Sequence, residues 1–413
     1  MLPLTPPPGF RFHSPYARVH GRASHVQEAP RNHCFACFGP FLGRLRGHEL
    51  VEGGIREVGM SLVHGKPRDM GEHRENANEP WTVLLAGGEG RRLSSFIRTV
   101  HADDRPKQFA TIIGTRSMLQ HTYDRALRHS LPERILIAIT AGQERWAFEQ
   151  LPWAPERNFL VQPRNLDTGP AIALAVAHVM AQDPSGSILV LPTDHFVYPE
   201  ESLERILADV LLNLGRIDET SMILLGANPS GPSEGLGWIL PERAVENGNR
   251  SRFLKVRDFV EKPKREVAQR LYANGALWNT FILAGKVHAF WHSLRKRVPE
   301  VTSRLARACY QLDQDTRVRK AKQVFSNIEP FNFSTRVLAH GAGRLFVMPL
   351  EGVHWNDWGT PEGVLESIEL MGWEHRLRVS LSRPRTLRSM ATPEFAGLTE
   401  EVRGRLQASG ALD

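Results

Sequence analysis

The segment LAGGEGRRL (residues 85–93) combines small residues and cations in a pattern suited to binding phosphate. Its glycines are Gly87, Gly88 and Gly90. They permit positive φ angles and close backbone approach, so consecutive N–H groups can face one phosphate, and Arg91 and Arg92 add forked cationic donors. A tight turn between a strand and a helix would use the same glycines. A dinucleotide fingerprint needs glycine where Leu93 stands, and the Gly-Lys-Ser/Thr ending of a P-loop is missing.

One lysine and two aspartates suit the neighbourhood of a bound triphosphate. Lys107, in the segment RPKQF, can neutralise phosphate charge, although a lysine in a loop is often a solvated surface group. Asp194 ends an apolar run that fits a buried strand, and ligands of α/β sheets bind at such ends. With Asp357 it would supply the few carboxylates that Mg²⁺ takes beside phosphate and water. The alternatives are a turn cap for Asp194 and a helix-start turn before Pro361 for Asp357.

Three polar residues in the second half of the chain have the chemistry of a sugar site. Glu261 and Lys262, in the segment FVEKP, can bind sugar hydroxyls and a phosphate, or they form a salt bridge at a strand end. Asn279 is the single amide in the apolar segment LWNTFIL. A buried amide needs hydrogen-bond partners, which a sugar, the backbone or water can supply.

These residues lie between runs whose apolar periodicity fits alternating strands and helices. Strands are expected at 81–86, 134–140, 159–162, 187–192 and 221–227. Helices are expected at 117–129, from Thr168 or Gly169 to 180, and at 200–214. The alternation predicts an α/β fold with a Rossmann-like, mostly parallel sheet and helices on both faces. The later segments GWILPE, FLKVRDFVE and LWNTFILAG predict a smaller mixed sheet that forms the sugar pocket.

The composition excludes several classes of protein. The 413 residues carry a net charge of +7 that is not gathered into a stripe, so we expect no nucleic-acid partner. No apolar run has the length of a bilayer span, so we expect no membrane insertion. The N-terminus lacks the apolar core of a secretion signal, and three cysteines make no disulfide framework. These features predict a cytoplasmic protein.

Eight segments occur in the order found in sugar nucleotidyltransferases: LAGGEGRRL, PKQF, QPRNLDTGPAIALA, LPTDH, GLGWI, FVEKP, WNTF and DWGTP. Over residues 81–370 the chain resembles this family, and most of all the mannose-1-phosphate guanylyltransferases (GDP-mannose pyrophosphorylases). It departs from the family where Ser94 and Ser95 replace a usual proline, where residues 101–105 lengthen a loop, and in Leu236 and Thr280. The segment NLDTGP is also longer than the usual NTGP. These departures concern the base and the sugar more than the reaction class.

The resemblance implies roles for individual residues. Binding of the nucleotide falls to Gly87, Gly88, Gly90, Arg91, Arg92, Lys107, Gln162, Asn165 and Gly169, with Gln162 and Asn165 in the segment that meets the base. Binding of the sugar falls to Gly237, Glu261, Lys262 and Asn279. Arg92, Lys107 and Lys262 offset charge during catalysis, and Asp194 and Asp357 hold Mg²⁺.

The expected reaction joins a nucleoside triphosphate, with GTP expected, to a sugar 1-phosphate, with mannose 1-phosphate expected. The sugar phosphate attacks the α-phosphorus in line and pyrophosphate leaves. The product, GDP-mannose, would serve polysaccharide biosynthesis. The alternatives are another base or sugar, or a catalytically silent regulator that binds sugar nucleotides. A silent protein need not retain Asp194, Asp357 and Lys107 together, and this chain has all three. The sequence does not decide the oligomeric state, for which a homodimer is one alternative.

The sequence divides into three parts. Residues 1–80 are interpreted as an irregular or disordered extension, 81–370 as the nucleotidyltransferase domain, and 371–413 as a weakly structured tail with at most a short helix near 393–406. The extension is rich in proline and histidine and lacks a periodic apolar face. We expect residues 1–69 to be dispensable, with a true start at Met60 or Met70. The rival interpretation is an accessory module, such as a zinc module at Cys34 and Cys37, although further ligands at zinc-finger spacing are missing.

Overall fold

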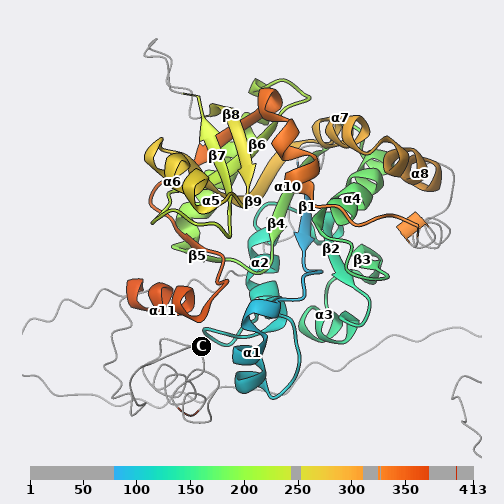
Figure 1. Ribbon diagram of the computed structural model, residues 1–413. Helices are drawn as coiled ribbons and strands as arrows, with labels where there is room; N and C mark the ends of the chain where they lie inside the picture. Colours follow the sequence, from blue (N-terminus) through green and yellow to red (C-terminus); the bar gives the residue numbers. More distant parts are fainter. Residues whose placement is uncertain (1–78, 243–252, 310–323, 326, 372–396, 398–413) are drawn as a thin grey trace, which may run out of the picture. The chain divides into compact units, whose positions relative to one another are not determined.

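The computed structural model of the protein describes residues 79–242, 253–309, 324–325, 327–371 and 397. The predictions for the remaining residues, including the N-terminal extension up to residue 78 and nearly all of the C-terminal tail, lie outside the described part. The described chain centres on a sheet with strand order β3-β2-β1-β4-β9-β6-β10-β8-β7 (Figure 1). Its strands are β1 (Trp81–Leu85), β2 (Ile135–Thr140), β3 (Phe159–Gln162), β4 (Ser187–Pro192), β6 (Met222–Ala227), β7 (Gly237–Pro241), β8 (Leu254–Glu261), β9 (Leu277–Lys286) and β10 (Leu345–Pro349).

The sheet is parallel in one half and mixed in the other. Strands β3, β2, β1 and β4 are mutually parallel, as the alternation of strands and helices predicts. The long strand β9 then lies antiparallel between β4 and β6, and β8 and β7 follow beyond β10. The prediction of a separate smaller mixed sheet is therefore wrong, because β7 and β8 extend the same sheet. A pattern of apolar residues does not reveal whether the neighbouring strand is parallel or antiparallel.

Helices cover both faces of the sheet, because successive strand residues point to opposite sides. Val83 packs into the apolar cluster that includes α4 (Thr168–Gln182), α7 (Val287–Arg297) and α8 (Pro299–Cys309). Leu84 packs into the cluster that includes α2 (Met118–Leu127), α3 (Glu144–Gln150) and α5 (Glu200–Asn213). Helix α4 is apolar almost all round because it lies between the sheet and α7 and α8 (Figure 1).

Several helices begin at the residues that the sequence indicates. Ser117 forms a capping box with Gln120 at the start of α2. Asp167 caps α4 by accepting a hydrogen bond of 2.6 Å from the backbone N–H of Thr168. Thr360 caps α11 (Pro361–Leu370), which begins with Pro361 as predicted.

Several short elements were not predicted. They are the helices α1 (Ser94–His101), α6 (Arg265–Ala273) and α10 (Phe333–Arg336), and the paired strands β5 (Phe196–Tyr198) and β11 (His354–Asn356). The pairing of β5 with β11 matters for the site, because it brings the segment after Asp194 beside the segment before Asp357. None of the helices in the described ranges combines the length and the apolar character needed to cross a membrane.

Candidate active site

Two adjoining cavities lie at the ends of the strands that carry the predicted residues. The larger, of about 650 Å³, is lined among others by Gly87, Gly88, Gln162 and Lys262. The smaller, of about 540 Å³, is lined among others by Gly90, Arg91, Arg92 and Lys107. Asn165 and Asp194 line both cavities. The first half of the sheet thus brings most of the predicted nucleotide residues together.

The carbonyl groups of the glycine segment are held by side chains. The Gly87 carbonyl accepts a hydrogen bond of 2.9 Å from Thr140 Oγ1. The Gly88 carbonyl accepts from Gln108 Nε2 at 2.7 Å and from Gln143 Nε2 at 3.0 Å. These contacts fix the peptide planes of the loop without a ligand. Reasoning from sequence missed Gln108 and Gln143, and only the position of Gln108 beside Lys107 could have indicated it.

Gly90 lets Lys107 approach the glycine segment. Its φ angle is +60°, which lies in the left-handed region. A Cβ atom at position 90 would lie 2.7 Å from the backbone nitrogen and 2.9 Å from the Cβ of Lys107. Both the backbone angle and the lack of space therefore require glycine here.

Lys107 is buried and joins the two acidic segments. Its side chain is only 5% exposed. Its Nζ donates to the Asp357 carbonyl at 2.6 Å and lies 3.1 Å from Asp194 Oδ2. The alternative of a solvated surface lysine is therefore wrong, because the ammonium group lies between a carboxylate and a carbonyl at the edge of the smaller cavity.

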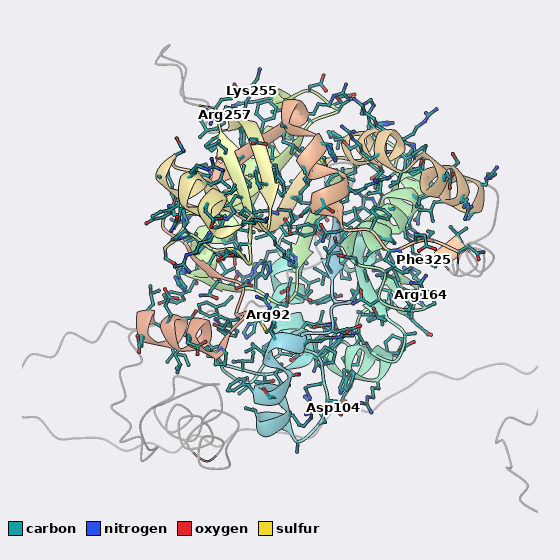
Figure 2. The ribbon with its side chains drawn as sticks, viewed as in Figure 1. Arg92, Asp104, Arg164, Lys255, Arg257 and Phe325 are labelled. Atoms are coloured by element: carbon teal, nitrogen blue, oxygen red, sulfur yellow. The ribbon has the colours of Figure 1, made fainter. Side chains whose placement is uncertain are left out.

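Each of the two aspartates contacts a cation. Burial by itself would raise the pKa of Asp194, but the charge and hydrogen bond of Lys107 together with the charges of His195 and Arg92 hold this pKa below its ordinary value. Asp357 accepts a hydrogen bond of 2.9 Å from Arg92 Nη2, and its other oxygen accepts from the Gly359 N–H at 3.2 Å. Arg92 lies in the short segment just before α1, and its side chain is labelled in Figure 2.

The acidic groups suit a metal that is shared with phosphate. Within the described ranges, no group of three or more His, Cys, Asp or Glu side chains could hold a metal ion. Mg²⁺ binds through one or two carboxylates and completes its shell with phosphate oxygens and water. Asp194 and Asp357 fit this donor set, and they do not fit an ion held by protein ligands alone.

The predicted base segment contributes two amides to the larger cavity. Gln162 is 3% exposed, and its Oε1 is buried without a hydrogen-bond partner in the described part of the chain. A buried amide oxygen in this state is ready to accept from a ligand. Asn165 Oδ1 accepts from the Asp167 N–H at 3.0 Å, and its Nδ2 lies 3.4 Å from Glu89 Oε1.

Two residues predicted to bind the nucleotide, Gly169 and Arg91, are placed differently from the other predicted nucleotide residues. Gly169 is not among the residues that line the two cavities, and its N–H donates to the Phe331 carbonyl at 3.0 Å. Arg91 borders the smaller cavity, but its side chain is 84% exposed and pairs with Glu89. The structure therefore places Gly169 away from the cavity walls, and it leaves the Arg91 side chain in solvent at the cavity border instead of burying it as it does Lys107.

The four predicted sugar residues converge at the ends of β7, β8 and β9. A Cβ atom on Gly237 would lie 2.5 Å from Glu261 Oε2 and 3.2 Å from Asn279 Cβ, so the missing side chain makes room for the carboxylate. Burial raises the pKa of Glu261. Asn279 Oδ1 accepts a hydrogen bond of 3.1 Å from the Phe281 N–H, so the backbone satisfies its oxygen. Lys262 lines the larger cavity.

Left-handed backbone at non-glycine residues clusters around the cavities. Asp167, Lys262 and Phe281 have φ angles of +67°, +44° and +58° and line the larger cavity. Trp358, at +41°, lines the smaller one. Such angles are costly and are commonly retained at functional sites. Residue types alone do not predict them, since none of the four is glycine.

Comparisons with known proteins identify a family and relatives that this chain resembles. A sequence profile of the family described as Nucleotidyl transferase matches residues 81–371. Xanthan biosynthesis protein XanB of Xanthomonas campestris pv. campestris (strain B100) is 28% identical over 298 residues, which cover 70% of this chain and 60% of XanB. Mannose-1-phosphate guanylyltransferase 2 of Escherichia coli O157:H7 is 29% identical over 294 residues, which cover 67% of this chain and 58% of that protein. The chain thus spans only about three fifths of the length of these relatives.

Solved structures share the fold. A mannose-1-phosphate geranyltransferase from Thermus thermophilus superposes with a TM-score of 0.58 at 24% identity, covering 68% of this chain and 76% of that one. A mannose-6-phosphate isomerase from Helicobacter pylori superposes with a TM-score of 0.52 at 18% identity, covering 67% and 99% respectively. At these identities the likeness concerns the mixed α/β architecture.

Proposed function

Because this chain belongs to the nucleotidyl transferase family, we propose that it transfers a nucleotidyl group from a nucleoside triphosphate to a sugar 1-phosphate and releases pyrophosphate. The contact set of Lys107 carries this proposal. The backbone of Lys107 packs against Gly90 of the glycine segment, and its buried ammonium group contacts the Asp194 carboxylate and the Asp357 carbonyl. A positive charge beside Asp194, which lines both cavities, is what a reaction between two anionic substrates needs.

The proposed reaction needs positioning and charge neutralisation more than proton transfer. The sugar phosphate oxygen is already ionised near neutral pH, so it attacks the α-phosphorus without a general base. Arg92 and Lys107 offset charge on the triphosphate from the smaller cavity, and Lys262 does so for the sugar phosphate from the larger one. Holding both substrates in line supplies much of the acceleration in transfers of this kind.

Asp194 and Asp357 would hold Mg²⁺ in the substrate complex. When bound there, the ion would supply positive charge that reduces the repulsion between the two substrates. In the structure these carboxylates contact Lys107 and Arg92, which would offset further negative charge of the substrates.

GTP and mannose 1-phosphate are the proposed substrates, and the nucleotide sugar would supply polysaccharide biosynthesis. The support is the segment PRNLDTGPAIALA and the names of the relatives from Escherichia coli and Xanthomonas campestris. Gln162 and Asn165 would meet the base, and Gly237, Glu261 and Asn279 would meet the sugar. The unpartnered Gln162 oxygen is an acceptor that suits the donor groups of guanine.

The test is a pyrophosphate-release screen that pairs four nucleoside triphosphates with a panel of sugar 1-phosphates in the presence of Mg²⁺. We expect the highest kcat/KM with GTP and mannose 1-phosphate. The matched variants are Lys107→Met, which should be nearly inactive, and Lys264→Met, which removes an exposed lysine outside the two cavities. A preference for dTTP, UTP or CTP would contradict the proposed base. Nucleotide-sugar binding without turnover of any pair would indicate a silent regulator instead.

A further inference from the structure

Residues 328–334 form a bridging segment that joins the loop at residues 166–169, its nucleotide end, to Glu261, its sugar end. Pro330 and Asn332 line this cavity. We infer that the bridging segment positions the two substrates relative to each other, with Asn332 holding the nucleotide end through Asp167 and Ser334 holding the sugar end through Glu261. This inference rests on the proposed function, and it assigns positioning residues that the sequence motifs do not contain.

The nucleotide end of the bridging segment is held by a run of hydrogen bonds to residues 166–169. Two join backbone groups: the Phe331 N–H donates to the Leu166 carbonyl at 3.3 Å, and the Gly169 N–H donates to the Phe331 carbonyl at 3.0 Å. Asn332 Nδ2 then donates to Asp167 Oδ1 at 3.1 Å. The segment is thus fixed to the loop that carries the proposed base-binding residues.

Gly169 is glycine because the bridging segment passes directly over it. A Cβ atom there would lie 2.1 Å from the Phe331 ring and 2.5 Å from the Phe331 carbonyl oxygen. The ring can rotate away, but the carbonyl belongs to the backbone and accepts the Gly169 hydrogen bond. A residue that the family resemblance assigns to the nucleotide therefore acts through the bridging segment in this structure.

The sugar end depends on a buried hydroxyl group. Ser334 is 2% exposed, and its side chain lies within hydrogen-bonding reach of Glu261, where it lowers the pKa of that carboxyl against the larger effect of burial. A hydroxyl donates to a carboxylate, and such bonds are stronger than bonds between neutral groups. Gly237 leaves room for the Glu261 carboxylate on its other side. Ser334 and the space at Gly237 together set the direction in which Glu261 faces a sugar hydroxyl.

Packing of Phe333 in the apolar core fixes the position of the bridging segment. Phe333 is fully buried between Asn332 and Ser334 and packs edge-on against Phe281, with ring centroids 6.3 Å apart. The Phe333 N–H also donates to Thr168 Oγ1 at 3.0 Å. Because Phe281 itself lines the larger cavity, the same aromatic contact ties the segment to the cavity wall.

Two variants separate the ends of the segment. Ser334→Ala removes the donor to Glu261 and leaves the nucleotide end intact. Asn332→Asp keeps an acceptor for the Thr335 N–H, which caps α10, but replaces the donor to Asp167 with a second carboxylate. The matched control is Glu329→Gln, which changes the charge but hardly the size of an exposed side chain on the same segment, outside the two cavities. Ser334→Cys, with a weaker donor of similar size, replaces Ser334→Ala if that variant does not fold.

The measurement is the KM of each substrate with the full chain, GTP and mannose 1-phosphate. Losing a hydrogen bond to a charged group corresponds to roughly a tenfold or larger change in affinity. Ser334→Ala should raise the KM for the sugar phosphate about tenfold and leave the KM for the nucleotide within about twofold. Asn332→Asp should raise the KM for the nucleotide about tenfold and leave the KM for the sugar phosphate within about twofold, and Glu329→Gln should change neither KM.

Equal changes in both KM values, or a lowered melting temperature with both KM values unchanged, would show that the bridging segment is merely structural and would overturn the inference. A wild-type protein that turns over no substrate pair would remove the proposed function and this inference together. An active wild type whose sugar-phosphate KM is insensitive to Ser334→Ala would overturn the inference alone.

Discussion

Gly90→Ala tests the contact that brings Lys107 into the site. Alanine at φ +60° costs about 1–2 kcal/mol in backbone energy. Its Cβ would also lie 2.7 Å from the Lys107 nitrogen, a backbone atom that cannot move away as a flexible side chain would. We expect a total loss of about 2–4 kcal/mol, in the range of mutations that strain the backbone. For a domain of this size that lowers the melting temperature by about 4–8 °C.

The matched control is Gly88→Ala in the same segment. A Cβ atom at position 88 meets nothing within 4 Å, and the φ angle of Gly88 lies outside the left-handed region. The melting temperature should therefore change by no more than about 2 °C. Gly88 lines the larger cavity, however, so the added methyl group should raise the KM for the nucleotide by about tenfold.

Thermal melting and steady-state kinetics distinguish the two variants. Gly90→Ala should lower both the melting temperature and kcat, because the strained backbone displaces Lys107 from Asp194 and Asp357. Gly88→Ala should change only the KM for the nucleotide. A Gly90→Ala protein with the melting temperature and kcat of the wild type would refute the account of the glycine segment.

Three further predictions concern other parts of the molecule. Asp194→Asn should lower kcat by at least about a hundredfold while the protein still folds, with a lowered melting temperature because the buried Lys107 loses its partner. Excess EDTA should abolish wild-type turnover, and full activity in EDTA would exclude the magnesium proposal. Burial alone would raise the pKa of Glu200, but the Arg125 guanidinium at 2.5 Å lowers this pKa below its ordinary value of 4.5. The ion pair therefore stabilises the folded state above about pH 4.5, and this stabilisation is lost as the pH falls through the lowered pKa. Arg125→Met should lower the free energy of unfolding by about 2–3 kcal/mol at pH 7, which is less than for a fully buried pair because the Glu200 side chain is 32% exposed. The difference in melting temperature between this variant and the wild type should shrink in acid, and a difference independent of pH would contradict the prediction. A shortened chain that begins at Met70 should keep full turnover and nearly the same melting temperature, because the preceding sequence lacks a periodic apolar face; loss of folding would show that this segment packs on the core.

The parallel half of the fold was predicted well from the sequence, because short apolar runs such as 187–192 form buried strands and the segments between them are long enough for helices. It did not predict where β9 would lie. The nearly continuous apolar run LWNTFILAG indicates a strand buried on both faces, but the pattern does not encode the neighbouring strand. Strand β9 enters between β4 and β6, and this contact merges the two predicted sheets into one.

Within the site, the sequence indicated which residues carry charge but not which of them are buried. Lys107 and Arg91 have similar chemistry, yet one is enclosed by Asp194 and backbone carbonyls while the other faces solvent. Only tertiary contacts decide this difference. The bridging segment shows the same limit, since Asn332 and Ser334 lie in a run without a recognisable motif. The packing of the buried Phe333 places Asn332 at the cavity wall and Ser334 beside Glu261.

The most direct test of the central claim follows the oxygen atoms of the sugar phosphate. Mannose 1-phosphate labelled with ¹⁸O in its non-bridging phosphate oxygens is incubated with GTP, Mg²⁺ and the protein, and the products are weighed by mass spectrometry. Attack of the sugar phosphate on the α-phosphorus predicts a nucleotide sugar that retains all of the label and pyrophosphate that carries none. Labelled pyrophosphate, or release of unlabelled phosphates without any nucleotide sugar, would contradict the proposed reaction.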